Sequence, residues 1–273
     1  MSGILKPYKS LINLIDFYRE LGIKYRVERS GNSIALFVKG SKYFASTVNM
    51  GNAGATLPSK QLFFIQKVRS HIMKENLIAK IKKNYAKQNL IQYIGFNDDI
   101  GEGEVFEKAY SVDIKNAYWE SAYKEGWLND DIYIEGKGMD KRIRLASLGT
   151  FAKKKFCYSF DGKGDEYLET IEMPKHPHVF FNQANTIYWL MDDCRKLVGD
   201  EFIFYWTDGV YVKSLEAAKK IESYLTSKGY EHKTEKLVNI IRHFNGFQTT
   251  EIKKLQNGKS ERKTKVYKSN LVK

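Results

Sequence analysis

The chain has 273 residues, of which 42% are hydrophobic and 14% aromatic, which suffices for one large or two small packed domains and excludes a peptide or a disordered tail. No apolar run reaches the roughly 18 residues that a membrane-spanning helix needs. Cys157 and Cys194 are too few for a disulfide framework, and the N-terminal segment lacks a signal-peptide pattern. We therefore expect a soluble, cytoplasmic protein (in a host cytoplasm or nucleoid) that is not secreted.

The net charge of +13 is unevenly distributed along the sequence. Residues 1–97 carry a net charge of +12 and residues 251–273 carry +6, whereas residues 98–250 carry −5. Two basic ends around an acidic centre suit a protein that binds nucleic acid at its margins and keeps carboxylates for metal chemistry inside. A generic basic surface and ribosome-like or membrane-surface partners are the alternatives. These changes in net charge along the sequence predict three regions: a basic N-terminal nucleic-acid-binding region, 1–97, a central region, 98–250, and a basic C-terminal tail, 251–273.

Hydrophobic periodicity predicts the elements of the N-terminal region. Apolar residues at helical spacing predict a helix over 9–21. Two strand-like runs predict a hairpin over 25–38 that continues to Phe44. Residues 61–88 place apolar positions among seven Lys and Arg, which predicts one long basic helix. Its basic face would either follow a phosphate backbone or be simply solvated.

The central region mixes helical and strand-like periodicity, which indicates an α+β fold. The first elements we expect are a strand at 110–113 followed by a helix, a short strand around 132–134, and a basic helix that begins at 141 and ends near Gly149. A hairpin over 156–172, an amphipathic helix over 182–197 and an apolar hairpin over 202–212 should follow. The last expected elements are a helix over 214–229, a strand over 237–244 and a basic strand-and-turn tail.

Two aspartates end apolar strands of this region. Asp113 stands where a buried strand turns into a helix, a place in which an Asp is more often just a helix N-cap. Asp208 stands at the tip of an apolar hairpin, where an isolated Asp-Gly pair would indicate only a turn. Taken together, two acids that point to one face of a small sheet predict a metal site.

Three segments resemble, in the right order, the palm motifs of family B DNA polymerases. Asp113-Ile-Lys-Asn-Ala-Tyr118 is similar to the first motif, an Asp followed by x-x-Ser-Leu-Tyr. Arg142-x-x-x-Ala-Ser-Leu-Gly149-x-Phe is similar to the second, Lys-x-x-x-Asn-Ser-x-Tyr-Gly, and Phe204-Tyr-Trp-Thr-Asp-Gly209 is similar to the third, Tyr-x-Asp-Thr-Asp-Ser. The predicted helix over 182–197 precedes the third motif, as in the family. The resemblance covers 110–213, well under half of the chain.

The resemblance implies a polymerase palm, which is a small antiparallel sheet backed by helices, together with a reduced fingers helix and a basic N-terminal α/β region. It implies template-directed DNA synthesis from dNTPs, assisted by two Mg²⁺ or Mn²⁺ ions. By similarity, Asp113 and Asp208 are catalytic and hold these ions, and the backbone carbonyl of Ile114 is a third ligand. Hard oxygen ligands of this type are the ones that Mg²⁺ prefers.

Further site residues follow from the same resemblance. Tyr118 corresponds to an aromatic gate beneath the sugar that selects deoxynucleotides, and Arg142 to a donor for the triphosphate oxygens. The nucleotide-binding residues implied in this way are Tyr118, Lys141, Arg142, Ser147 and Gly149. The implied DNA contacts are Thr207, Lys265 and Tyr267, of which the last two are similar to a later Lys-x-Tyr element of the family that touches the primer terminus.

The sequence also departs from the family pattern. Trp206 replaces the first Asp of the third motif, Ala146 stands where Asn is expected, and Gly209 replaces Ser. The sequence leaves little room for fingers or a thumb and shows no exonuclease motif, so we expect low processivity or dependence on a processivity or replication partner protein. The size suggests a primase or gap-filling enzyme of a virus or mobile element. The alternatives are a catalytically inactive palm that acts as a nucleic-acid-binding replication accessory, and a Mg²⁺-dependent nuclease.

Overall fold

A computed structural model of the chain describes residues 4–30, 33–46, 59–87, 91–254 and 260–268. Contacts between residues divide the chain into two compact units. Unit 1 comprises Met1–Lys87 and Ala122–Asn182, and unit 2 comprises Gln88–Ser121 and Gln183–Lys273. This grouping differs from the division of the sequence by charge, because the segment 122–182 joins the N-terminal region and the basic tail joins the strands that carry Asp113 and Asp208.

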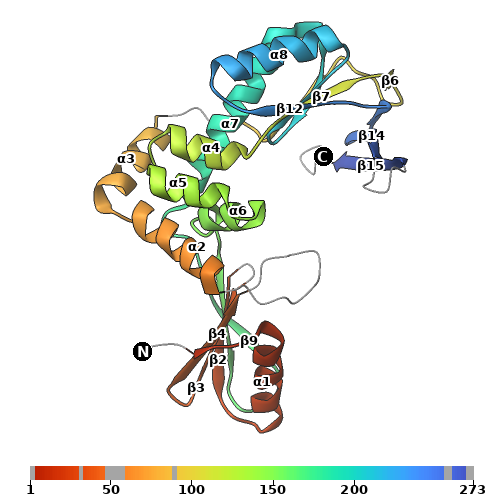
Figure 1. The fold of residues 1–273 in the computed structure, drawn as a ribbon. Coiled ribbons are helices and arrows are strands. Elements are labelled where there is room, and N and C mark those ends of the chain that lie inside the picture. Colours follow the sequence, from red (N-terminus) through yellow and green to blue (C-terminus); the bar gives the residue numbers. More distant parts are fainter. Residues whose placement is uncertain (1–3, 31–32, 47–58, 88–90, 255–259, 269–273) are drawn as a thin grey trace. The chain divides into compact units, whose positions relative to one another are not determined.

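A six-stranded sheet ordered β1-β4-β3-β2-β8-β9 forms one part of unit 1. Its strands are β1 (Ile4–Leu5), β2 (Tyr25–Ser30), β3 (Ser33–Val38), β4 (Ser41–Ser46), β8 (Lys155–Phe160) and β9 (Tyr167–Glu172). Helix α1 (Tyr8–Glu20) packs on this sheet, where Leu11 and Ile15 are buried against Val27 and Leu36 (Figure 1). The predicted first helix and both predicted hairpins of this sheet are therefore confirmed.

The helical part of unit 1 corrects two predictions. The single helix expected over 61–88 is two helices, α2 (Ser59–Ile72) and α3 (Glu75–Tyr85), because the backbone at Lys74 is extended although the apolar pattern runs through it. The strand expected around 132–134 is helix α5 (Asp130–Lys137). Its N-cap Asn129 accepts a hydrogen bond from a backbone N–H, and two aspartates in the first turn favour a helix start.

Unit 2 contains a five-stranded antiparallel sheet ordered β12-β7-β11-β10-β5. Its strands are β5 (Ile94–Phe96), β7 (Tyr110–Ile114), β10 (Phe202–Trp206), β11 (Gly209–Val212) and β12 (His232–Lys236). The elements that connect them include helices α4 (Ala117–Lys124), α7 (Pro177–Val198) and α8 (Leu215–Ser227) and a 3₁₀ helix (Gly199–Glu201). Helices α7 and α8 cover one face, where Met191 and Ile221 are buried with Val112 and Val210 (Figure 1). The predicted hairpin at 202–212 and both predicted helices are confirmed.

A four-stranded sheet ordered β15-β14-β13-β6 covers the opposite face. Its strands are β6 (Val105–Glu107), β13 (Asn239–His243), β14 (Gly246–Lys254) and β15 (Ser260–Lys268). Ile240 and Phe247 from this sheet are buried in one cluster with Phe204 and Tyr211 from the five-stranded sheet. The predicted α+β class, with a small antiparallel sheet backed by helices, is confirmed. Among the described residues, no helix combines the length and apolar character that a bilayer span requires.

Candidate active site

Asp113 and Asp208 lie at the same end of the five-stranded sheet. Strands β7 and β11 are antiparallel neighbours in which Asp113 lies opposite Gly209, the residue that follows Asp208. The Ile114 backbone N–H donates to the carbonyl oxygen of Asp208 at 2.9 Å. The Asp113 carboxylate lies so close to Gly209 that a Cβ atom there would be 2.3 Å from Oδ1. The structure thus brings together two acids that are far apart in the sequence.

The turn that carries Asp208 is held in an unusual backbone conformation. Thr207 has a φ of 53°, in the left-handed region that β-branched residues rarely adopt. Its backbone N–H donates to the carbonyl oxygen of Tyr93 at 2.7 Å, and its hydroxyl donates to Asp208 Oδ1 at 2.8 Å. These bonds fix the turn and the direction of the Asp208 carboxylate. Thr207, expected to contact DNA, thus also orients one of the two acids.

Strand β15 brings the Lys-x-Tyr element, Lys265 and Tyr267, to the same end of the sheet. The hydroxyl oxygens of Tyr267 and Tyr211 are 2.6 Å apart, and Lys265 Nζ is 3.5 Å from a carboxylate oxygen of Glu251. Burial by itself would lower the pKa of Lys265, but Tyr267, Glu251 and Asp113 raise it. The ammonium group therefore lies within electrostatic reach of the Asp113 carboxylate.

The sequence did not indicate two charged residues of this region, one next to Asp113 and one next to Lys265. Lys233 of β12 lies opposite Asp113 on the other side of β7, and its pKa is raised by its hydrogen bond to Glu235 and by Asp113. Glu251 of β14, only 4% exposed, pairs with Lys265. Strand β12, which carries Lys233, is polar and lacks the apolar alternation that predicts a strand. Glu251 lies at the start of the basic tail, where the sequence does not predict burial. Only the alternation of charge in the segment 232–236 could have indicated Lys233.

Tyr118 lies in the first turn of α4. Its hydroxyl is hydrogen-bonded with that of Tyr188 on α7. Burial raises the pKa of Tyr118 most, and Tyr188 and Asp208 raise it further, so this phenol stays protonated. Tyr118 therefore lies within electrostatic reach of the Asp208 carboxylate. Its task as a sugar gate stays a prediction.

The nucleotide-binding residues predicted in the second motif lie on α6 (Lys141–Gly149) in unit 1, whereas both carboxylates lie in unit 2. Lys141 is exposed, and the Arg142 guanidinium is 3.0 Å from the carboxylate of Asp140. Ser147 is fully buried and donates its hydroxyl to the backbone carbonyl one turn earlier at 2.8 Å. The helix ends at Gly149, where a Cβ atom would meet open space. Nucleotide contacts by these residues stay predictions.

Replacing Asp140 with alanine should destabilise unit 1. The Asp140 carboxylate caps α6 by accepting from the Arg142 backbone N–H at 2.8 Å, and hydrogen bonds from Arg142 lower its pKa to about 2. Because the folded pKa lies below the unfolded value near 3.9, this stabilisation is present above about pH 4 and is lost as the pH falls towards 2. We expect a loss of about 1 kcal/mol in the free energy of unfolding at pH 7. Urea denaturation should show a smaller loss at pH 3; equal losses would contradict the assignment.

The donor atoms at Asp113 and Asp208 suit a hard divalent cation. Carboxylate oxygens, with the neighbouring backbone carbonyl of Ile114, are the ligands that Mg²⁺ and Mn²⁺ accept readily. The fixed turn at Thr207 and the strand register hold these donors in place before any ion arrives. The predicted ions fit the chemistry of the donor set, and their number stays a prediction.

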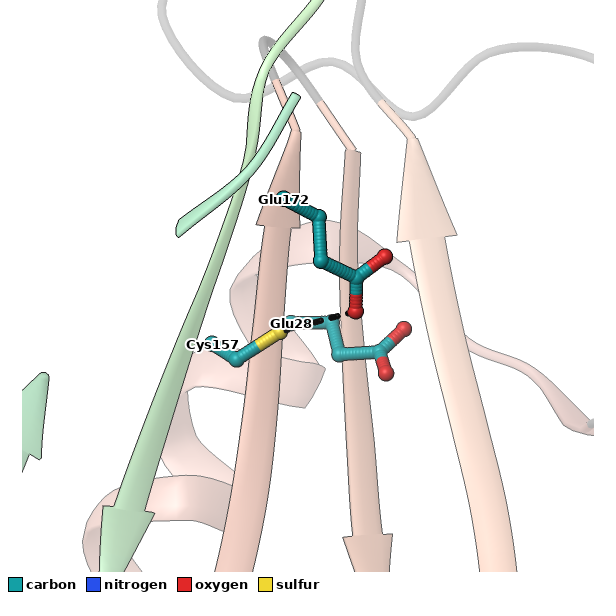
Figure 2. Close-up of side chains that lie close together, drawn as sticks. All are labelled: Glu28, Cys157 and Glu172. Carbon is teal, nitrogen blue, oxygen red and sulfur yellow. Dashed lines mark hydrogen bonds between the residues drawn. The ribbon is translucent and has the colours of Figure 1, made fainter. Parts of the chain in front are cut away.

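A second group of candidate ligands lies in unit 1. Within the described part of the chain, Glu28, Cys157 and Glu172 are the one set of three His, Cys, Asp or Glu residues whose ligand atoms lie within 4.8 Å of one another (Figure 2). The Cys157 thiol is fully buried and donates to Glu172 at 3.6 Å. Lys155 Nζ lies 3.3 Å from Glu28 and 2.9 Å from Glu172. Lys155 thus pairs with both acids and Arg26 pairs with Glu28, so we interpret this group as an ion-pair cluster of the sheet.

Comparisons with known proteins give a distant structural likeness. No protein-family model and no curated protein matches the sequence. Phi29 DNA polymerase complexed with single-stranded DNA is similar with a TM-score of 0.47 and 10% identity, over 79% of this chain and 60% of that one. Phi29 DNA polymerase complexed with primer–template DNA is similar with a TM-score of 0.45 and 10% identity, over 82% of this chain and 62% of that one. The chain thus spans about three fifths of the length of the polymerase chains that it matches.

Proposed function

We propose that this chain is a metal-dependent nucleotidyltransferase that synthesises DNA from dNTPs on a template, as a minimal enzyme resembling family B DNA polymerases. The observation that carries the proposal is the register of β7 and β11, in which Asp113 lies opposite Gly209 and beside Asp208. The order of the three sequence motifs and the basic N- and C-terminal segments add support.

In this proposal, Asp113, Asp208 and the carbonyl oxygen of Ile114 hold Mg²⁺ or Mn²⁺. The bound ions would activate the primer 3′ hydroxyl and stabilise the leaving pyrophosphate. The residues of the chain position the reactants: the Thr207 hydroxyl orients Asp208, and the strand register fixes Asp113. The residues proposed to bind the nucleotide are Tyr118, Lys141, Arg142, Ser147 and Gly149.

DNA contacts are proposed for Thr207, Lys265 and Tyr267 and for the basic segments. Lys265 and Lys233 add positive charge near Asp113, which would attract a phosphate backbone. We further propose that a processivity or replication partner protein prolongs contact with the template.

One assay tests the proposal. The full chain is incubated with Mg²⁺ or Mn²⁺, labelled dNTPs or rNTPs, and either primed or unprimed single-stranded templates. We expect metal-dependent extension of primed templates with dNTPs and none with EDTA. Product on unprimed templates would indicate that the chain also has primase activity. Absence of product under every condition would refute DNA synthesis.

Two other functions have a specific observation behind them. A nucleic-acid-binding accessory without catalysis is favoured by Trp206, which replaces an acid of the motif and packs on aromatic rings. A Mg²⁺-dependent nuclease is favoured by Lys233 and Lys265 near Asp113, since such enzymes often pair their acids with a lysine. DNA affinity that falls steeply with salt, without synthesis, indicates the first. Shortening of the labelled DNA indicates the second.

Replacing Tyr118 with alanine should relax the choice of sugar. If the aromatic ring lies beneath the sugar of the incoming nucleotide, its removal leaves space for a 2′ hydroxyl. We expect the ratio of kcat/KM for dNTPs to that for rNTPs to fall by about tenfold or more. Tyr188→Phe serves as the control, because it removes the hydroxyl that pairs with Tyr118 but leaves the Tyr118 ring in place. This variant should keep the wild-type ratio of dNTP to rNTP kcat/KM. Unchanged discrimination in Tyr118→Ala would remove the gate assignment.

A further inference from the structure

An aromatic cluster fills the space between the two sheets of unit 2, next to the carboxylates. The rings of Tyr211 and Phe204 are stacked with centroids 4.1 Å apart, and Phe204 stacks on Phe247 at 4.4 Å. Tyr267 of β15 lies against Trp206 with a centroid distance of 5.3 Å. The cluster therefore connects the strand that precedes Asp208, the strand that follows it, and the Lys-x-Tyr strand.

One hydrogen bond crosses this cluster. The hydroxyl oxygens of Tyr211 and Tyr267 are 2.6 Å apart, and Tyr211 is only 5% exposed. Burial, and then Asp113 and Tyr267, raise the pKa of Tyr211 well above its usual value, so the phenol keeps its proton. Leaving a buried hydroxyl without its partner costs more folding free energy than the hydrogen bond itself contributes. The bond thus restricts how far β15 can move from β11.

The same strand face carries Lys265. In β15, Lys265 and Tyr267 are two residues apart and so point to the same side of the sheet. The Lys265 ammonium pairs with Glu251 and responds to the charge of Asp113. Any bond that holds Tyr267 relative to β11 therefore also limits how far the backbone at Lys265 can move from this end of the sheet.

We propose that Tyr211 is a positioning residue whose hydroxyl holds Tyr267, and with it Lys265, near the Asp113 carboxylate. The ligand that this arrangement aligns is the 3′ end of a DNA primer, with its phosphates towards Lys265. Trp206, which occupies the place of an acid in the motif, supports Tyr267 from β10 by ring contact. This inference rests on the proposed function.

Conservative substitutions test the inference in the full chain. Tyr211→Phe, Tyr267→Phe and the double variant keep the rings and remove the hydroxyls. We expect each single variant to lower kcat for primer extension by about tenfold. Because both substitutions break the same bond, the double variant should be no slower than the slower single variant. Independent, multiplicative losses, or a wild-type kcat in Tyr211→Phe, would overturn the proposal.

Tyr205→Phe is the matched control. The Tyr205 hydroxyl donates to the carbonyl oxygen of Gln92 at 2.9 Å, and its ring lies on the helix-covered face of the same sheet. This variant should lose as much thermal stability as Tyr211→Phe while its kcat stays at the wild-type value. A merely structural role for Tyr211 predicts equal kcat losses in both variants.

A binding measurement separates this inference from the proposed function. Fluorescence anisotropy without metal compares a 3′-recessed duplex with a blunt duplex. If the wild type makes no DNA, the proposed synthesis fails, yet the inference still requires a preference for the recessed end. Tyr211→Phe and Tyr267→Phe should reduce that preference equally, and Tyr205→Phe should retain it. No preference in the wild type, or an unchanged preference in Tyr211→Phe, rejects the inference.

Discussion

Replacing Asp113 or Asp208 with asparagine should abolish metal-dependent DNA synthesis. Both side chains keep their size, but each loses the negative charge that binds a divalent cation. Metal stabilisation of the transition state amounts to several kcal/mol, so we expect the rate of primer extension to fall by about a thousandfold or more. Extension of a labelled primer, measured across Mg²⁺ and Mn²⁺ concentrations, checks this result.

The control for these variants is Asp98→Asn, which removes the same charge from an exposed residue of the same unit. It should extend primers at the wild-type rate. Both site variants should also keep the wild-type affinity for primer–template without metal, because the DNA contacts are proposed elsewhere. Product formation that survives both substitutions would show that these acids hold no catalytic ion.

Replacing Gly209 with alanine should strongly reduce the proposed primer extension without unfolding the protein. A Cβ atom at this position would lie 2.3 Å from Asp113 Oδ1, closer than any real contact, so the carboxylate must move away. Moving the end of one side chain costs little stability. It displaces a proposed metal ligand, however, and a shift of about 1 Å at a reacting centre can cost about a hundredfold in rate.

The matched control is Gly101→Ala, since a Cβ atom there meets nothing within 4 Å and the residue lies in the same unit. Both variants should melt within a few degrees of the wild type, and only Gly209→Ala should lose primer extension. Gly209→Ser should behave like the alanine variant, although the polymerase motif has serine here. Full activity of either Gly209 variant would show that the position of Asp113 is not critical.

Strong periodicity and apolar strand ends made the main features of unit 2 predictable. The strand that carries Asp113 is mostly apolar, and the hairpin around Asp208 has an apolar run in each strand. The helices that cover them show clear amphipathic patterns. The proximity of the two acids followed from their places at strand ends. The register that sets Asp113 opposite Gly209 was beyond prediction, because pairing between distant strands leaves no local pattern.

Weak or misleading local patterns account for the errors. The apolar stripe of 61–88 continues across the break at Lys74, so it did not reveal two helices. Ile132 and Ile134 alternate with Tyr133 as in a strand, but the N-cap at Asn129 favours a helix. Glu251 and Lys233 are ordinary charged residues in the sequence. The pairing of β12 with β7 sets Lys233 opposite Asp113, and the pairing of β14 with β15 brings Glu251 to Lys265.

The return of the chain to unit 2 has a consequence for the order in which the protein folds during synthesis. Asp113 leaves the ribosome early, but its partner strand β11 follows only after the segment 122–182 of unit 1 has been made. Strand β15, with Lys265 and Tyr267, comes later still. We therefore expect a nascent chain to hold an unpaired β7 edge for much of its synthesis. Chains truncated before β15 would bear both acids yet lack the bond between Tyr211 and Tyr267.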